Sequence, residues 1–171
     1  MVKNMGNMKF LYKEASPDEL IAVWDKNIAD NAGDERWVTW RDGVIEGNKA
    51  GDEKTFVVLY ENKPVGEATL IFSPQVLGGK SELADGVNTV NINGLRVDKH
   101  FRGQGHSSRL VQKMEQYARE AGYKIITIGV EARETRNLAI YLHWGFNKFV
   151  MSEFDSEFGD GALLLYYSKT L

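Results

Sequence analysis

The chain has 171 residues, of which 43% are hydrophobic and 26% charged, a composition typical of one soluble globular domain with a sizeable core. Its net charge of −3, without a run of lysine or arginine, argues against nucleic acid or an acidic membrane surface as the main partner. The absence of cysteine excludes disulfides, a thiolate nucleophile and a cysteine-bound zinc, and the three histidines lack the spacing of a metal site. No apolar run could span a membrane, and residues 1–8 contain no apolar signal core. We therefore expect a single cytoplasmic domain over residues 1–171, without a bound metal.

The first elements expected along the chain are a strand and two helices. Residues 9–13 are predicted to form a short strand. A helix is expected to follow, because residues 16–19 (Ser-Pro-Asp-Glu) form a capping pattern with proline at the first helical position. A second, shorter helix is expected over residues 35–44. We interpret its Trp37 and Trp40 as core residues, with lining of an acceptor pocket as the alternative.

Three strands are expected next. Residues 55–60 and 65–72 are apolar stretches on either side of a turn, which predicts a β-hairpin. A polar, glycine-containing loop covers residues 73–86. Residues 89–97 are predicted to form a third strand with a bulge at Gly94, since glycine inside a strand often marks an irregular backbone or a close approach.

The second half of the chain has clearer periodicity. Apolar residues recur at helical spacing over residues 104–121, and Gly122 is a natural C-terminal stop for this helix. A buried strand, a short helix and two final strands complete the order β-α-α-β-β-β-α-β-α-β-β. They are expected over residues 125–130, 135–144, 146–154 and 163–168.

The most informative segment is the turn between the strand over residues 89–97 and the long helix. Glycines let the backbone turn tightly and approach a ligand closely. The first turn of a helix has N–H groups without an intrahelical partner, and together with the positive end of the helix dipole they favour a phosphate. An arginine adds a fixed cationic group. The predicted pyrophosphate site consists of Arg102, Gly103, Gln104, Gly105, His106, Ser107 and Ser108.

This turn and the order of elements resemble the GNAT superfamily of N-acetyltransferases. The family's phosphate motif is Gln/Arg-x-x-Gly-x-Gly/Ala, and here Arg102, Gly105 and Ser107 occupy the three marked positions. Ser107 is small but departs from the usual glycine or alanine. His106 stands where the family usually has an apolar residue, and we interpret it as a solvated residue at the helix start that could touch a phosphate.

A second family pattern lies downstream. The family often shows Asn-x-x-Ala-x-x-x-Tyr-x-x-x-Gly-Phe, and residues 141–146 match its Tyr-x-x-x-Gly-Phe half. Glu134 and Asn137 occupy the positions of the motif's asparagine and alanine. Asn137, one turn later, is our candidate for the missing side-chain contact to the pantetheine arm.

The resemblance implies a fold, a co-substrate and a mode of binding. The fold is a mixed α/β (α+β) arrangement: a mostly antiparallel sheet of about seven strands, splayed near the fourth strand and flanked by about four helices. Acetyl-CoA is the co-substrate, and its amide-rich pantetheine arm pairs with the strand edge formed by Leu95, Arg96 and Val97. Family members are often homodimers, so a homodimer is a further expectation.

The reaction implied is attack of a primary amine on the thioester within a ternary complex, without a covalent enzyme intermediate. A backbone N–H near Leu95 can stabilise the oxyanion. Tyr141 is suited to protonate the thiolate as general acid. A free alkyl amine is mostly protonated at neutral pH, so a base is needed, and both Glu67 and Glu131 are candidates.

Other functions and the acceptor stay open at this point. A half-match to the Gly-x-Gly-x-x-Gly/Ala pattern permits a dinucleotide-binding oxidoreductase, although an early βαβ repeat is missing. A non-catalytic acyl-CoA sensor or scaffold would keep the phosphate turn without needing Tyr141. The acceptor is expected to be a small-molecule or peptide amine, drawn by acidic residues in two regions. They are Asp18, Glu19, Asp25, Asp30, Asp34 and Glu35 near the first helix, and Glu153, Asp155, Glu157 and Asp160 in the last hairpin.

Overall fold

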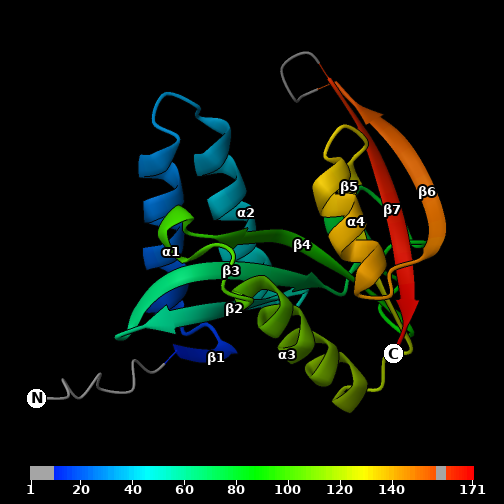
Figure 1. Cartoon of the computed structure of the whole chain (residues 1–171), viewed down its shortest axis with the longest axis horizontal. Coiled ribbons are helices and arrows are strands. Elements are labelled where there is room, and N and C mark those ends of the chain that lie inside the picture. Colours follow the sequence, from blue (N-terminus) through cyan, green and yellow to red (C-terminus); the bar gives the residue numbers. More distant parts are fainter. Residues whose placement is uncertain (1–9, 157–160) are drawn as a thin grey trace, which may run out of the picture. The chain divides into compact units, whose positions relative to one another are not determined.

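The structure is a computed structural model that describes residues 10–156 and 161–171. Within these residues, the chain forms a seven-stranded sheet and four α-helices, which confirms the predicted fold class and order (Figure 1). The strands are β1 (Phe10–Glu14), β2 (Glu53–Tyr60), β3 (Lys63–Ile71), β4 (Thr89–Val97), β5 (Ile125–Glu131), β6 (Lys148–Asp155) and β7 (Ala162–Thr170). The helices are α1 (Pro17–Asp30), α2 (Arg36–Ala50), α3 (His106–Glu120) and α4 (Thr135–His143), with 3₁₀ turns η1 (Pro74–Leu77) and η2 (Lys99–Phe101).

The sheet has the strand order β1-β2-β3-β4-β5-β7-β6. Antiparallel pairs join β1 to β2, β5 to β7 and β6 to β7, whereas β4 and β5 are parallel. The chain divides into two compact units: unit 1 comprises residues 1–69 and 94–113, and unit 2 comprises residues 70–93 and 114–171. The single domain over residues 1–171 stays a prediction.

Unit 1 places α1 and α2 side by side against β2 (Figure 1). The helix α1 begins where the sequence predicts, because Ser16 and Glu19 form a capping box. Its apolar face buries Leu20, Val23 and Trp24 against Val57 and Leu59 of β2. Side chains alternate along a strand, so neighbouring positions of β1 and β2 face the other side of the sheet. On that side, rings from β1 and β2 pack around the start of α3.

Unit 2 contains β5, β6, β7, α4 and the second half of α3. Most of the periodic apolar residues of α3 are buried as expected, with Met114 and Ala118 fully covered, while Tyr117 is half-buried. The predicted strands are present with shifted ends. The last two, for example, extend to Asp155 and Thr170.

Among the helices, the predicted end of α2 and the predicted start of α3 were wrong. The second helix continues to Ala50 instead of ending near residue 44, and Gly51 stops it with a φ of 82°. Gly43 and Gly47 weaken the helical signal of this segment. However, a Cβ at Gly47 would lie 2.9 Å or less from three side-chain atoms of Glu53, so this glycine makes room for a buried side chain. The third helix begins at His106 instead of Gln104, because Gly103 and Gly105 both have positive φ.

Candidate active site

The predicted phosphate turn has the backbone that an anion requires. Gly103 and Gly105 have φ values of 74° and 82°, a region that other residues rarely adopt. No atom lies within 4 Å of where their Cβ atoms would be, so the space beside the backbone is open. The helix α3 begins directly after them, and its first N–H groups have no partner within the helix. The residues present therefore fit a pyrophosphate held by backbone N–H groups.

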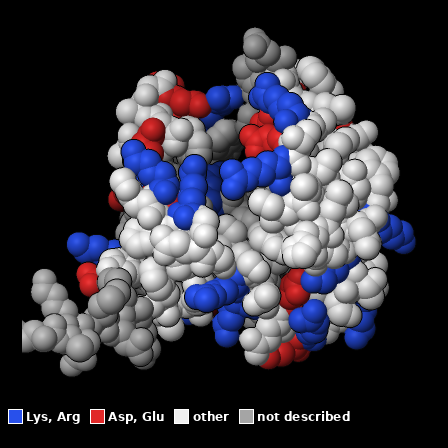
Figure 2. Space-filling view, viewed as in Figure 1, with Lys and Arg blue, Asp and Glu red and all other residues white. Residues whose placement is uncertain are grey.

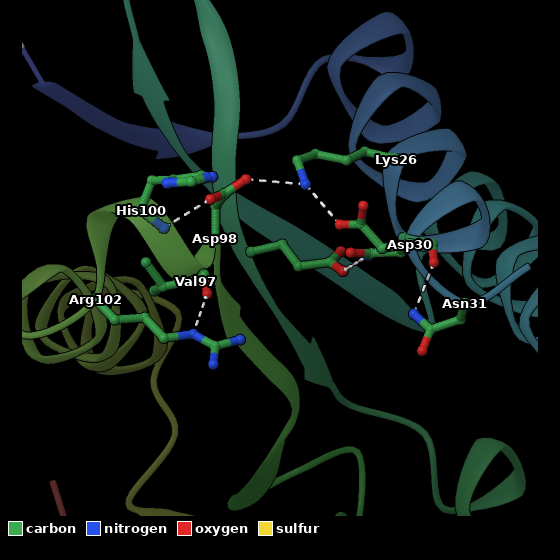
Figure 3. A network of polar contacts seen from close by, with 9 residues as sticks. Lys26, Asp30, Asn31, Val97, Asp98, His100 and Arg102 are labelled. Carbon is green, nitrogen blue, oxygen red and sulfur yellow. Dashed lines mark hydrogen bonds and ion pairs between the residues drawn. The ribbon is translucent and has the colours of Figure 1, made fainter.

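A network of polar side chains holds the residues that lead into this turn (Figure 3). Asp98 accepts a hydrogen bond of 2.9 Å from the backbone N–H of His100 and caps η2. Its other carboxylate oxygen lies 2.9 Å from Nζ of Lys26, which also reaches Asp30 of α1 at 2.6 Å. Arg102 donates from Nε to the carbonyl of Val97 at 2.8 Å. The guanidinium of Arg102 is thus held through Nε, while the residue as a whole is exposed.

Sequence analysis did not find Lys26 or Asp98. Asp98 lies at a capping position directly before the turn, which is a signal that could have identified it. Lys26 lies more than seventy residues earlier in the sequence and carries no such signal. Hydrogen bonds to Asp30 and to Asp98 raise the pKa of Lys26. The hydrogen bonds that Asp98 accepts from Lys26 and from the backbone of His100 lower the pKa of Asp98.

The interpretation of His106 as a solvated residue was wrong. Its side chain is 3% exposed, and its Nδ1 lies 2.6 Å from the hydroxyl of Tyr12 on β1. Phe10 and Phe101 pack against the imidazole ring, with ring centroids 4.3 and 6.4 Å away. Burial and the neighbouring Arg109 lower the pKa of His106, which favours the neutral form of the ring. The side chain anchors the start of α3, and only the backbone of His106 can serve a phosphate.

The strand edge predicted for the pantetheine arm begins at a backbone irregularity. Gly94 has a φ of 67°, which confirms an irregular backbone at this position. In the described residues, β4 pairs with β5 from Thr89 to Ile92 and no further. Leu95 and Arg96 beyond this point are half-buried, and Val97 is buried. The backbone groups of these three residues are consequently not used by β5.

Glu67 is the more buried of the two candidate bases. This residue on β3 is 1% exposed, and its Oε1 accepts hydrogen bonds from Asn27 of α1 and from Arg96, the latter at 3.1 Å. Its Oε2 is buried without a hydrogen-bond partner in the structure. Burial raises the pKa of Glu67, and the nearby Arg96 opposes that rise. A buried carboxylate of raised pKa is a better proton acceptor near neutral pH than an exposed one.

Glu131, the other candidate base, lies at the end of β5 in unit 2. It forms an ion pair of 2.6 Å with Arg133, whose side chain is largely exposed. The carboxylate of Glu131 is therefore already paired with a cation, whereas Oε2 of Glu67 has no hydrogen-bond partner among the described residues. Environment therefore distinguishes the two glutamates, although the sequence treats them alike.

Tyr141 and Asn137 both lie on α4 of unit 2. Burial, with a smaller contribution from Glu134, raises the pKa of Tyr141 to about 12. The phenol is consequently protonated throughout the physiological range and can donate a hydrogen bond. The side-chain amide of Asn137 donates to the carboxylate of Glu134, so the two residues at the motif's asparagine and alanine positions bind each other.

The acidic residues that predicted a cationic acceptor are mostly paired in the structure. Glu153 accepts a hydrogen bond of 2.8 Å from Tyr166 and lies 3.0 Å from Nζ of Lys80. Near the first helix, four further ion pairs are Glu19–Lys13, Asp25–Arg41, Asp30–Lys26 and Asp34–Arg36. On the face shown in Figure 2, lysine and arginine side chains lie beside many of the acidic groups. Glu157 and Asp160 lie outside the described residues.

A sequence model described as the acetyltransferase (GNAT) family matches residues 9–146. This match covers most of the chain, so the chain belongs to the GNAT family and is an acetyltransferase. None of the curated proteins matches the chain. In the part of the chain that the structure describes, no helix is long and apolar enough to cross a membrane, and no group of residues could hold a metal ion.

Solved structures share the fold over nearly the whole chain. An N-acetyltransferase from Staphylococcus aureus Mu50 is 20% identical with a TM-score of 0.65, over 95% of this chain and 98% of its own. An acetyl transferase from Salmonella typhimurium that modifies the N-terminal serine of ribosomal protein L7/L12 is 17% identical with a TM-score of 0.68, over 97% and 96%. The yncA protein from Salmonella typhimurium, solved with its cofactor acetyl-CoA, is 17% identical with a TM-score of 0.67, over 97% and 95%.

Proposed function

We propose that this chain transfers the acetyl group of acetyl-CoA to a primary amine by direct attack in a ternary complex. The observation that carries the proposal is the turn over residues 102–108, where two glycines of positive φ precede α3 with open space beside them. Backbone N–H groups there would hold the pyrophosphate. The strand edge at Leu95, Arg96 and Val97 would hold the pantetheine arm, and Asn137 is a proposed contact to that arm.

Glu67 is the base we favour for the acceptor amine. Its raised pKa suits proton acceptance, and its buried Oε2 has no other hydrogen-bond partner in the structure. Because the carboxylate is almost fully buried, the proton would reach it through a water molecule. Glu131 is the weaker candidate, since its carboxylate is occupied by an ion pair with Arg133.

Tyr141 is proposed as the acid that assists the leaving sulfur. A thiol has an ordinary pKa of about 8.5, whereas that of Tyr141 is raised to about 12. A phenol of this kind is a dependable hydrogen-bond donor, and it transfers its proton fully only if another proton replaces it. Tyr141→Phe should therefore lower kcat by about 10²–10⁴-fold with little change in CoA affinity.

Release of free thiol from acetyl-CoA across a panel of amines tests the proposed function. Stimulation by at least one primary amine, with formation of its N-acetyl product, is the expected result. Binding of acetyl-CoA without transfer to any amine would favour the second candidate, an acyl-CoA sensor or scaffold. Homodimer formation and a cationic acceptor stay predictions. Sedimentation tests the first, and the dependence of KM on salt tests the second.

A further inference from the structure

Arg96 is held in one position by side chains from three elements. Its guanidinium carbon lies 5.3 Å from the ring centroid of Trp24 and 4.8 Å from that of Trp37. The two indole centroids are 6.2 Å apart, so the rings form a corner around the cation. Nη1 donates to Glu67, and a Cβ at residue 94 would lie 3.1 Å from Nη1, so Gly94 leaves the room that this arrangement needs.

The immobilised guanidinium still has donors to offer. An arginine carries five N–H donors in a planar fork, and among the described residues its hydrogen bond to Glu67 is the one that Arg96 makes. The side chain is 33% exposed, whereas that of Glu67 is 2% exposed. The ion pair thus keeps its carboxylate inside and presents the remaining edge of the cation outward.

We infer that Arg96 selects an acceptor that carries a carboxylate beside its amine, as a free α-amino acid does. This inference rests on the proposed function, which places acetyl-CoA along the strand edge that includes Arg96. A planar guanidinium fork matches a carboxylate in a bidentate way, and little side-chain freedom remains to be lost when the anion binds. A carboxylate bound to Arg96 would then lie next to the reacting carbonyl of acetyl-CoA. In an acceptor that carries both groups, this contact would bring the amine to that carbonyl.

The charges around Arg96 favour such a zwitterion over a polycation. The indole rings that could attract an acceptor cation already hold the guanidinium of Arg96. Ion pairs also occupy several of the carboxylates on α1 and in the segment that follows it. The acceptor's carboxylate meets Arg96, while its ammonium lies near the buried charge of Glu67, which takes the proton when the amine attacks.

Three matched acceptors test this inference: the best amino acid of a panel, its carboxamide, and the amine that lacks the carboxyl group. In the wild-type enzyme, the amino acid should have a kcat/KM about 10- to 100-fold higher than either relative, as expected for a hydrogen bond between charged groups. Arg96→Gln also removes the ion-pair partner of Glu67, so kcat/KM should fall for all three acceptors. The three values should then become equal, which is the loss of preference that the inference predicts. Arg36→Gln is the matched control, since Arg36 also stacks on an indole, that of Trp40, and should keep the preference.

Binding of the acetylated products gives a measurement that does not depend on turnover. Calorimetry with CoA present should show the N-acetyl amino acid binding at least about 10-fold more tightly than the N-acetyl carboxamide, and Arg96→Gln should abolish the difference. Circular dichroism confirms that the variant is folded. Equal rates for the three acceptors, or equal binding of the products, would overturn the role of Arg96 while leaving the acetyltransferase proposal intact. Absence of thiol release with every amine would overturn the proposed function instead. The binding of the N-acetyl products would still test whether Arg96 binds a carboxylate.

Discussion

Two buried glutamates of unit 1 meet opposite electrostatic surroundings. Glu67 on β3 is bonded to Asn27 and Arg96, whereas Glu53 at the start of β2 is 6% exposed and has Asp52 as its charged neighbour. In both, one carboxylate oxygen is buried without a hydrogen-bond partner, and burial raises the pKa. For Glu53 the pKa rises to about 7, from an ordinary value of 4.5.

The difference separates a carboxylate placed for chemistry from one placed by packing. A cation beside Glu67 makes its charged form tolerable, so the group can lose and regain a proton while the protein stays folded. Glu53 has an acidic neighbour, so ionisation of its side chain works against the folded state. We expect changes at Glu67 to appear in activity and changes at Glu53 to appear in the pH dependence of stability.

The largest effect is expected from Glu67→Gln. Loss of a general base should lower kcat/KM by about 10²–10⁴-fold. The wild-type kcat/KM should rise with pH through the raised pKa of Glu67, and this limb of the profile should disappear in the variant. Steady-state kinetics from pH 5 to 9 would check both.

The matched change for Glu67→Gln is Glu131→Gln, which removes a surface carboxylate paired with Arg133 and should keep kcat/KM within a few-fold of the wild type. If Glu131→Gln instead gave the larger loss, the assignment of the base would move to Glu131.

Gly105→Asp should separate binding from chemistry. It adds a negative charge where the pyrophosphate is proposed to approach, at a φ of 82° that disfavours side chains. Like charges placed together cost several kcal/mol, so the Kd for CoA should rise at least about 100-fold. Calorimetry measures this change. Gly51→Asp is the control, because Gly51 has the same φ and equally open space but lies at the end of α2. Equal CoA affinity in the two variants would refute the phosphate turn.

Glu53→Gln should change stability instead of turnover. Glu53 binds its proton more tightly in the folded chain than in the unfolded chain, so its contribution to stability is complete below about pH 4.5 and is lost as pH rises through about 7. At 1.36 kcal/mol for each pKa unit, the loss is on the order of 3 kcal/mol. Urea unfolding at pH 5 and pH 8 should show this loss in the wild type and a much smaller one in Glu53→Gln. A similar loss in both would mean that another group titrates.

Local sequence features account for the parts of the site that could be predicted. The spacing of Gly103 and Gly105 before an amphipathic helix determines the backbone of the turn, whatever the rest of the chain does. The capping residues of α1 and the periodicity of α3 likewise act over a few residues. All three features depend on residues close together in the sequence, so they can be predicted from a single sequence.

The side-chain environments could not be predicted, because they depend on contacts far apart in the sequence. His106 is buried by Tyr12, 94 positions earlier, and Glu67 is bonded to Asn27, 40 positions earlier. Sequence analysis interpreted Trp37 as a core residue and Arg96 only as part of a strand edge. The contact between the guanidinium of Arg96 and the indole of Trp37 joins β4 to α2, so it depends on the fold of unit 1 and could not be predicted from the sequence. The choice between Glu67 and Glu131 needed the same information.

Lys26→Met should produce the smallest effect and shows whether α1 positions the phosphate turn. Lys26 joins Asp30 of α1 to Asp98, and Asp98 also caps η2 and donates its backbone N–H to Val65 (Figure 3). Ion pairs near the surface contribute about 0.2–1 kcal/mol each, so the Kd for CoA should rise a few-fold, with kcat unchanged. High salt should reduce the difference, since screening weakens the wild-type pair as well.

A matched variant distinguishes positioning from a general loss of stability in α1. Lys13 forms an ion pair with Glu19 in the first turn of α1. This pair does not include Asp98, whereas Lys26, later in α1, binds Asp98 directly. Lys13→Met should therefore leave CoA affinity unchanged, and Lys26→Arg should restore it. Calorimetry at 0.1 M and 1 M salt measures all three variants. If Lys13→Met and Lys26→Met weaken CoA binding equally, Lys26 acts through helix stability. If only Lys26→Met does so, the bridge to Asp98 holds the turn in place for the pyrophosphate.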